Sequence, residues 1–489
     1  MSRILRGEGE AAAGALPWAL ILALLAVRAV MAGILPITAD EAYYWLWSRH
    51  PDFGYLDHPP MIAWLIRAGT LLFGDTFFGV RFSGLILSGL ATFFVWKSGQ
   101  ALLREETKAV TAALFFNLTL MTNAEMLAAT PDMPSIATSA ALLFCLARLQ
   151  QTGDGRYWLL GGVAAGLGLL SKYSALFLIG GAFFWLALSP GERRWLKGPW
   201  PWAAAVLALL VFLPHLIWQQ GHDWETFRFQ FSRIAGHQLT ARFIVEFAGA
   251  QLGLASPFIL VLGAVGLWAA RRDSALFLPA MLIWPALAYF VIHALHDRVQ
   301  GNWPCFLYPA FSILAASQFA PWRDWSGRLA VPVAGLFLVL VYGQALTGFI
   351  PLGTRDPLPR LFGAGVRPMA ASLADAVKQH LAAAILTTDY ESTAWLRFYQ
   401  PRLKVIQVGE TARYPNAPAP DAALLRQPLL YAVERRRDQS AELRKYFSFL
   451  SLGPEIHVGC RGCPENRPIA TFEIYSVEGP KASVPGRMP

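Results

Sequence analysis

Apolar segments near the length of a membrane span recur along most of the chain, separated by polar turns. The first runs from about Leu16 to Leu35. Ten more lie at about 80–103, 109–129, 134–149, 157–170, 174–188, 200–218, 243–269, 275–295, 304–320 and 329–350. An α-helix needs ~20 apolar residues to cross the hydrocarbon core of a bilayer. The pattern therefore predicts a polytopic α-helical membrane protein with about eleven spans.

The composition agrees with this class. Hydrophobic residues make up 55% of the chain and charged residues 15%, which excludes an ordinary soluble domain of this size. The net charge of +9 is modest, and no basic cluster suited to nucleic acid stands out, so we expect no nucleic-acid partner. The N-terminus resembles a signal peptide but shows no clear cleavage site, and we interpret it as an uncleaved anchor.

Basic residues in the connections set the orientation. In membrane proteins, short cytoplasmic loops carry an excess of Lys and Arg. With the N-terminus inside, every even-numbered connection is short, basic and cytoplasmic. The outer connections are then 36–79, 130–133, 171–173, 219–242, 296–303 and everything after residue 350.

The first outer connection holds the densest chemistry. Its sequence TADEAYYWLWSRHPDFGYLDHPP (38–60) mixes acids with aromatic residues that favour the water–lipid boundary. The acids and His58 follow a membrane span, where carboxylates are costly and usually functional. The next stretch, 61–74, is apolar but short and interrupted by Arg67, which predicts an amphipathic helix in the interface.

The other motifs fall on the same outer face. They are TPDMP at 130–134, SKY at 171–173 and HDRVQGNWP at 296–304, whereas the cytoplasmic loops carry only ordinary basic residues. This one-sided clustering predicts a single composite site facing the exterior or periplasm. Its ionisable members are Asp40, Glu41, Asp57, His58, Asp132, Lys172, His296, Asp297 and Arg298.

The residues from 351 to 489 form a second domain in this interpretation. Segments 382–390, 403–409, 427–433 and 470–477 have the pattern of strands, and 372–381 and 441–450 that of helices. We expect a small α/β domain outside the membrane. Cys460 and Cys463 lie in it as a CRGC sequence, either as a disulfide or as unpaired thiols; a zinc site would need a second ligand pair.

The order of these features resembles the GT-C superfamily of membrane glycosyltransferases, in the bacterial branch related to protein O-mannosyltransferases and the lipid A aminoarabinose transferase. The matching pieces are Asp40-Glu41 after the first span, YLDHPP at 55–60 and Arg81-Phe82. They continue with TPD at 130–132, GLGLLSKY at 166–173, NWP and YPA between 302 and 310, and a terminal α/β domain. The resemblance covers nearly the whole chain.

The resemblance implies an inverting transferase in the bacterial inner membrane, with residues 1–350 as the transferase domain and 351–489 in the periplasm. It would move a hexose or pentose from a polyprenyl-phosphate carrier to an acceptor at the outer face. That acceptor would be lipid A or lipopolysaccharide, another envelope glycan or lipid, or a protein. The sugar donor and the acceptor would both bind the enzyme at the membrane surface, in contact with membrane lipid.

Inverting transfer needs a carboxylate that takes the acceptor's proton, and by resemblance that base is Asp40. Glu41 would orient Asp40 or contact the sugar, and Asp132 would contact a substrate or a metal. The leaving phosphate needs cations and hydrogen-bond donors, expected from Lys172, His58, Arg81 and Tyr308. His58 stands where the aminoarabinose branch has lysine, and histidine is only partly charged at neutral pH. The remaining substrate contacts are expected from Tyr55, Asp57, His296, Arg298, Asn302 and Trp303.

Each residue also has a plainer interpretation. Asp40-Glu41 could cap a helix, and Asp132 could be the N-cap of the fourth span. Lys172 could extend to the interface, and His58 could pack a loop. Asn123, Glu125 and His215 read as structural polar groups. The functional interpretation is favoured only because all these residues fall on the same, outer face of the membrane, where they could form one active site.

Two further questions stay open at this point. Asp40, Glu41, His58, Asp132 and His296 are possible ligands of a divalent metal, although we expect no catalytic requirement for one. The main alternative function is a flippase or transporter of lipid-linked sugars. Such a protein should show internal repeats and charges near the middle of the bilayer, and the sequence shows neither. A third alternative, an O-antigen ligase or polymerase, does not fit the acidic first loop.

Overall fold

A computed structural model describes residues 2–232, 239–320, 325–410, 413, 421–459 and 468–481. Its contacts divide the chain into two compact units. The helical unit comprises Met1–Gly33, His58–Leu65 and Arg81–Leu340, and the sheet unit comprises Ile34–Asp57, Ile66–Val80 and Val341–Pro489. The sheet unit therefore includes most of the first outer connection. The expected limit of a domain at residue 350 stays a prediction.

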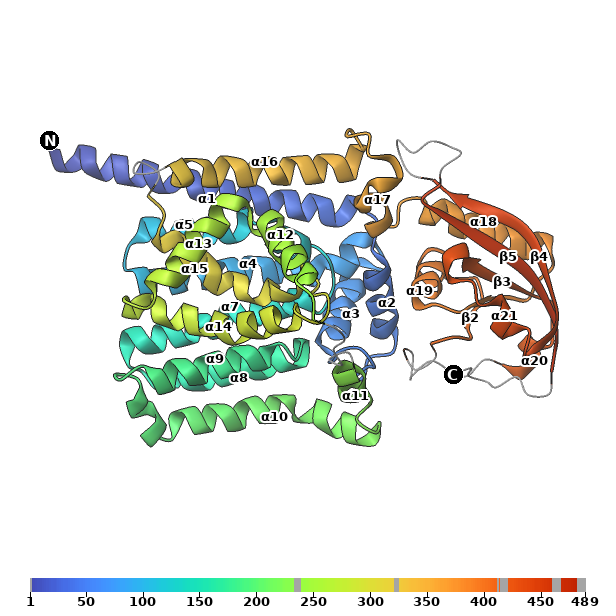
Figure 1. Ribbon diagram of the computed structural model, residues 1–489, viewed down its shortest axis with the longest axis horizontal. Helices are drawn as coiled ribbons and strands as arrows, with labels where there is room; N and C mark the ends of the chain where they lie inside the picture. Colours follow the sequence, from blue (N-terminus) through green and yellow to red (C-terminus); the bar gives the residue numbers. More distant parts are fainter. Residues whose placement is uncertain are drawn as a thin grey trace. The chain divides into compact units, whose positions relative to one another are not determined.

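The helical unit is built from apolar helices, several of which run nearly parallel in Figure 1. Its longer helices are α1 (Ser2–Ile34), α4 (Phe77–Leu103), α7 (Asp132–Thr152), α10 (Trp200–Gly221), α14 (Ser274–His293) and α16 (Trp325–Thr347). Its shorter ones are α5 (Glu106–Leu118), α6 (Leu120–Glu125), α8 (Arg156–Ser171), α9 (Ala175–Leu188), α11 (Glu225–Ser232), α12 (Arg242–Ala255), α13 (Pro257–Ala269) and α15 (Tyr308–Ser317). Short 3-10 turns, η1 (Arg193–Lys197) and η2 (Trp303–Leu307), precede α10 and α15.

Within the described ranges, six helices are long and apolar enough to cross a membrane, and a seventh span forms if α12 and α13 count as one. These two helices bend by 107° at Ser256, which has a positive φ of 69°. The remaining predicted spans form helices that are too short for this criterion. The predicted run 109–129, for example, is broken at Thr119, whose extended backbone ends α5 and whose side chain caps α6. The class of polytopic helical membrane protein is confirmed, and the count of eleven stays a prediction.

Glycine lets two neighbouring helices approach closely. A Cβ atom on Gly162 of α8 would lie 2.4 Å from the carbonyl oxygen of Ala204 on α10, and one on Gly166 would lie 2.6 Å from Val211. The two glycines are four residues apart and so share one face of α8. Small residues at this spacing allow close helix packing inside membranes. This contact helps to hold α8, whose C-terminal end carries Lys172.

The sheet unit contains a five-stranded sheet in the order β2-β1-β3-β5-β4. The strands are β1 (Ala384–Thr387), β2 (Val405–Gln407), β3 (Leu429–Glu434), β4 (Phe447–Val458) and β5 (Ala470–Pro480). Pairing is parallel for β1 with β2 and β3, and antiparallel for β3 with β5 and β5 with β4. The remaining elements of this part of the chain are η3 (Gly353–Arg355), α17 (Pro357–Leu361), α18 (Val366–Gln379), α19 (Tyr390–Tyr399), α20 (Ala422–Leu425), η5 (Arg435–Arg437) and α21 (Ser440–Leu443).

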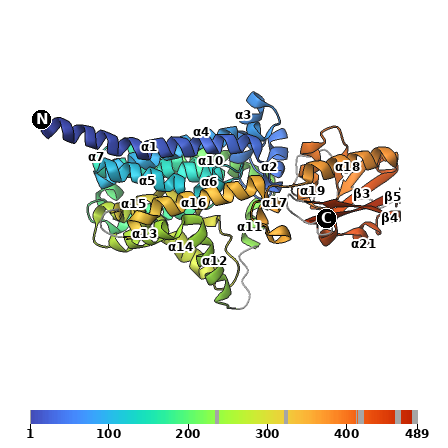
Figure 2. The ribbon, with the colours of Figure 1, turned by 90° about the horizontal axis from the view of Figure 1, so that it is seen from above.

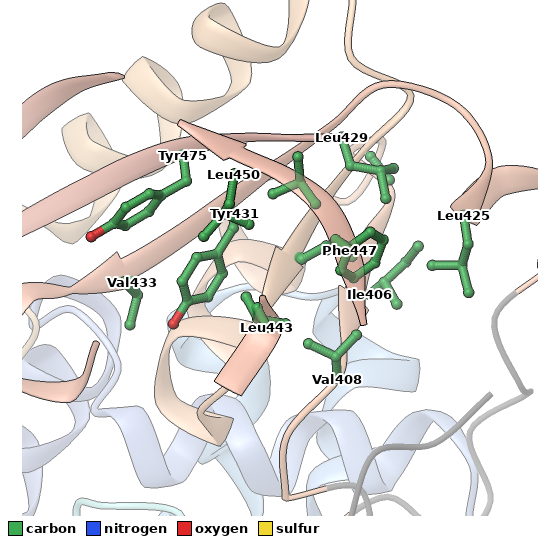
Figure 3. Packing of buried hydrophobic residues seen from close by; sticks show 13 residues of the cluster. Ile406, Val408, Leu425, Leu429, Tyr431, Val433, Leu443, Phe447, Leu450 and Tyr475 are labelled. Carbon is green, nitrogen blue, oxygen red and sulfur yellow. The ribbon is translucent and has the colours of Figure 1, made fainter. Parts of the chain in front are cut away.

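Both faces of this sheet are covered, because the central strands β1 and β3 are buried at every position. Figure 2 shows α18 and α21 on opposite sides of the sheet. Figure 3 shows one of the two cores, in which Tyr431, Val433 and Tyr475 pack with Phe447 and Leu443. On α18, the buried residues Val366, Met369, Ala370, Leu373 and Ala376 recur at helical spacing and form one face.

The strands expected at 382–390, 403–409, 427–433 and 470–477 are confirmed as β1, β2, β3 and β5. The helix expected at 372–381 overlaps α18, which begins earlier, at Val366, and ends at Gln379. The prediction of a helix at 441–450 is wrong. The helix α21 ends after one turn at Leu443, and Phe447 begins the long strand β4. Pairing with β5 and burial of Phe447 and Leu450 decide the conformation there, over the local helical preference of the sequence.

Candidate active site

The helix α2 (Ala39–Arg49) begins immediately after the first span and positions the acidic pair. Its N-terminus is a capping box, in which the Glu41 carboxylate accepts a 2.9 Å hydrogen bond from the Thr38 amide and the Thr38 hydroxyl accepts one of 3.1 Å from the Glu41 amide. Glu41 is fully buried. The expected role of Glu41 in orienting Asp40 thus has a simple physical basis, since this cap fixes the helical turn that carries Asp40.

Asp40 projects from that turn into a cavity inside the sheet unit. One carboxylate oxygen, Oδ1, accepts a 3.1 Å hydrogen bond from the hydroxyl group of Tyr390, the first residue of α19. The side chain is open to the cavity, which has a volume of about 250 Å3. Desolvation by the surrounding protein raises the pKa of Asp40 above its ordinary value, opposed by the Tyr390 hydrogen bond. A carboxylate with a raised pKa is a stronger base than an ordinary one.

Asp57 lies in the same unit but is already neutralised. Arg413 Nη1 lies 2.7 and 2.8 Å from its two carboxylate oxygens, and the Tyr43 hydroxyl donates a 2.5 Å hydrogen bond to it. The Arg413 guanidinium also lies 4.5 Å from the centre of the Tyr390 ring. Asp57 therefore anchors Arg413 beside Tyr390.

Tyr55, expected to bind substrate, closes the C-terminal end of α2. Its ring stacks on Trp47 at 4.3 Å between centroids, and its hydroxyl donates to the carbonyl oxygens of His50 and Trp47 at 3.1 and 3.2 Å. The ring is almost fully buried. The structure gives Tyr55 a packing role in holding the loop that carries Asp57.

A second cluster lies in the helical unit around Asp132, the first residue of α7. Lys172 Nζ contacts Asp132 Oδ1 at 2.7 Å, Asn302 Nδ2 donates to Oδ2 at 3.1 Å, and Cys305 Sγ donates to Oδ1 at 3.0 Å. The Asp132 and Lys172 side chains are only 6% and 17% exposed. The structure thus brings together four residues, Asp132, Lys172, Asn302 and Cys305, from three separate segments of the sequence. Asp132 itself is not the N-cap, which is Pro131.

The other expected residues of the 296–308 segment make their own contacts. The Tyr308 hydroxyl donates to Gln251 Oε1 at 3.0 Å, and Trp303 packs its ring against His293. Arg298 pairs with Glu246 at 2.9 Å on the surface, and His296 is half-buried. Asn302 is therefore the member of this segment that joins the Asp132 cluster through its side-chain amide.

Arg81 and His58, the remaining expected phosphate ligands, also lie in the helical unit. Arg81 is buried, and its Nη1 donates a 3.3 Å hydrogen bond to the carbonyl oxygen of Ala32 near the end of α1. His58 is half-buried. Arg81 thus lies at the end of the first span, where a cation also favours the C-terminal carbonyls of a helix.

Several partners in these clusters were missed from the sequence. Tyr390 and Arg413 belong to the sheet unit, more than 300 residues from Asp40 and Asp57. Arg28 is buried in the C-terminal part of α1 and hydrogen bonds to Ser88, Asn117 and Asn123 on neighbouring helices. A charged residue inside an apolar span was the available signal for Arg28.

His215, expected to be structural, is fully buried and its Nε2 lies 2.7 Å from the Tyr173 hydroxyl. Among the described side chains, no group of three or more His, Cys, Asp or Glu could hold a metal ion. Cys460 and Cys463 lie outside the described residues.

Comparison with known proteins shows which proteins this chain is similar to. The profile of the dolichyl-phosphate-mannose-protein mannosyltransferase family matches residues 57–218. The lipid A galacturonosyltransferase RgtD of Rhizobium johnstonii is 29% identical over 71% of this chain and 72% of its own length. Undecaprenyl phosphate-alpha-4-amino-4-deoxy-L-arabinose arabinosyl transferase 1 of Sodalis glossinidius is 30% identical over 40% of this chain and 38% of its own.

The fold is similar to that of a solved structure over almost the entire chain. The crystal structure of ArnT from Cupriavidus metallidurans in the apo state superposes with a TM-score of 0.64 at 18% identity, over 94% of this chain and 98% of that one. The chain has an ArnT-like fold and is similar in sequence to membrane glycosyltransferases. The predicted resemblance, enzyme class and membrane fold are confirmed.

Proposed function

We propose that this GT-C enzyme transfers a sugar, with inversion, from a polyprenyl-phosphate carrier to an acceptor of the lipid A or lipopolysaccharide class. The donor and acceptor classes follow from the relatives, whose names specify undecaprenyl phosphate for one and lipid A for the other. The reaction would take place at the outer face of the inner membrane, with the residues after 350 in the periplasm. The basic even-numbered connections support this orientation.

One observation carries the assignment of the base. Three acids of the proposed outer face, Asp40, Asp57 and Asp132, are compared as acceptors of the proton. Asp57 is paired with Arg413 and Asp132 with Lys172, so each of these carboxylates already has a cation as its partner. Asp40 instead receives its hydrogen bond from the neutral hydroxyl of Tyr390 and has a raised pKa. Asp40 is therefore the carboxylate best suited to general-base catalysis.

In this scheme the proton of the acceptor hydroxyl moves to Asp40 as its oxygen attacks C1 of the donor sugar. The bond between C1 and the carrier phosphate breaks on the opposite side, and polyprenyl phosphate leaves as an anion. The Asp132 cluster would serve the donor, with Lys172 supplying a cation for the leaving phosphate. Asp132 would hold the Lys172 ammonium in place, since Asn302 in turn fixes the second oxygen of Asp132.

The test is a single-compartment assay. Purified protein in detergent is mixed with a polyprenyl-phosphate sugar and lipid A, and released polyprenyl phosphate is measured together with glycosylated lipid. We expect stoichiometric formation of both. A transporter of lipid-linked sugars needs two compartments and would leave both substrates intact, which would contradict the proposal.

A further inference from the structure

The cavity beside Asp40 has features that the transfer reaction described above does not yet use. Its wall combines α2, α19 and the ends of β3 and β5, and includes Tyr390, Trp395, Arg360 and Arg436. A volume of about 250 Å3 is near the lower limit of ligand pockets, which measure ~300–1,000 Å3. The cavity therefore suits one sugar ring with its substituents and not a complete glycolipid.

Its charges are arranged unevenly. The wall acids Asp389 and Glu391 both contact Arg437, at 3.3 and 2.6 Å. Glu434 faces two guanidinium groups, with Arg436 at 2.7 Å and Arg360 at 3.7 Å. This corner of the cavity has two cations for one carboxylate, whereas the wall as a whole also contains Asp40, Asp389 and Glu391. Since Arg436 and Arg360 are about half exposed (47% and 49%), they can bind a further anion.

We propose that this cavity binds the acceptor, and that the acceptor is a saccharide that carries an anionic substituent in addition to the hydroxyl group it presents to Asp40. The hydroxyl would meet the Asp40 carboxylate, and the anion, a phosphate or a carboxylate, would meet Arg436 and Arg360. Tyr390 and Trp395 supply apolar ring surface for the sugar carbons. This inference rests on the proposed function, because it takes Asp40 as the group that deprotonates the acceptor.

The sheet unit then has a specific task in the reaction. It builds the acceptor site, while the Asp132 cluster of the helical unit serves the donor. Substitutions in the cavity should therefore affect the acceptor and leave the donor unaffected. This separation distinguishes a binding role from a merely structural one, which would alter both.

Direct binding tests the cavity without turnover. Ligand-observed NMR with the full-length protein in detergent would measure the affinity of glucose 6-phosphate, with glucose as the neutral control. Arg436→Gln should weaken binding of glucose 6-phosphate about tenfold, since a charge-assisted hydrogen bond is lost. Arg402→Gln is the matched control, because Arg402 is an exposed arginine of the same unit that does not line the cavity.

Filling the cavity gives an independent second variant. Ala470→Trp places a large ring in the wall and should abolish binding of the sugar phosphate, whereas Ala423→Trp, at an exposed alanine outside the wall, should not. Glucuronate in place of glucose 6-phosphate tells whether a carboxylate can replace the phosphate. If glucose 6-phosphate and glucuronate both bind no tighter than glucose, or if both cavity variants bind like the wild type, the inference is wrong.

Kinetics separates this inference from the proposed function. With lipid A as acceptor, Arg436→Gln should raise the acceptor KM about tenfold and leave the donor KM unchanged. Absence of transfer by every variant and the wild type, with sugar-phosphate binding still sensitive to Arg436, would overturn the function and retain the binding site. Normal transfer with an unchanged acceptor KM in both cavity variants would overturn the acceptor site and retain the function.

Discussion

The Tyr390 hydroxyl donates a 3.1 Å hydrogen bond to Asp40 Oδ1, and the two residues are 350 positions apart in the sequence. Asp40 lies in the first turn of α2, and Tyr390 is the first residue of α19. Both belong to the sheet unit. The carboxylate proposed as the base is thus positioned by the part of the chain that otherwise forms the small α/β fold.

Replacing Tyr390 by phenylalanine should move the pH dependence of transfer. The hydrogen bond stabilises the carboxylate, so its removal raises the pKa of Asp40 further. Because the base acts when deprotonated, activity is lost as pH falls through this pKa. The acidic limb of the kcat/KM profile should therefore move to higher pH by about one unit, the equivalent of ~1.4 kcal/mol.

Tyr44→Phe is a suitable control, since Tyr44 is a buried tyrosine of α2 that packs near the same aromatic cluster. Its acidic limb should stay in place. An unchanged limb in Tyr390→Phe would show that this hydrogen bond does not govern the group that titrates.

Asp40→Asn should lose roughly 10²–10⁴-fold in transfer rate, the usual scale for a general base. Asparagine preserves the size of the side chain and can still accept the Tyr390 hydrogen bond, so donor binding and folding should be unchanged. Glu41→Gln should lose much less, because glutamine can also complete the capping box with Thr38. Rates are to be compared at matched thermal stability. Near wild-type transfer by Asp40→Asn would exclude Asp40 as the base and make Asp132 the next candidate.

The sequence predicted the parts of this enzyme that depend on local pattern. The apolar runs gave the class of fold, and the motifs DEAYYW, TPDMP and SKY led to Asp40, Asp132 and Lys172. Asp132, Lys172 and Asn302 meet in the structure because each lies at or near a helix end that the hydrophobic pattern located. Similarly, β1 and β3 were found because buried strands read as continuous apolar runs.

Contacts between distant segments could not be predicted in this way. Nothing near Tyr390 or Arg413 in the sequence shows that they meet Asp40 and Asp57, since those contacts depend on the tertiary fold. The capping box could have been predicted from the sequence, because Thr38 precedes Glu41 by three residues. Asp40-Glu41 was instead interpreted first as a functional acidic pair. The strand β4 was misassigned because its pairing with β5 outweighs local propensity.

Arg413→Gln should destabilise the protein by about 3–5 kcal/mol, because it leaves the carboxylate of Asp57 buried without its cation. The Asp57 and Arg413 side chains are only 9% and 19% exposed. The double variant Asp57→Asn with Arg413→Gln should recover part of this loss, since no buried charge remains. Thermal unfolding of the purified variants measures both. Equal loss in the single and double variants would contradict a buried ion pair as the source of stability.

Reporter fusions test the proposed topology. A phosphatase reporter is active only outside the cytoplasm, so a fusion after Pro351 should be active and one near Arg194 inactive. The physical reason is the excess of arginine and lysine in the connections that contain Arg194 and its counterparts. The opposite pattern would overturn the orientation and with it the outward placement of Asp40 and Asp132.

The buried pair of Lys172 and Asp132 allows structure and donor binding to be separated. Lys172→Ala alone should weaken donor use severely, by ~2–5 kcal/mol of binding, and Lys172→Arg should retain part of it. Lys172→Ala also leaves the buried carboxylate of Asp132 without its cation, since Asp132 Oδ1 lies 2.7 Å from Lys172 Nζ. Adding Asp132→Asn removes that charge and should restore thermal stability. If Lys172 binds the donor phosphate, the double variant is stable yet still has a raised donor KM. A stable double variant with the wild-type donor KM would leave Lys172 as a structural partner of Asp132 and place the phosphate contact elsewhere.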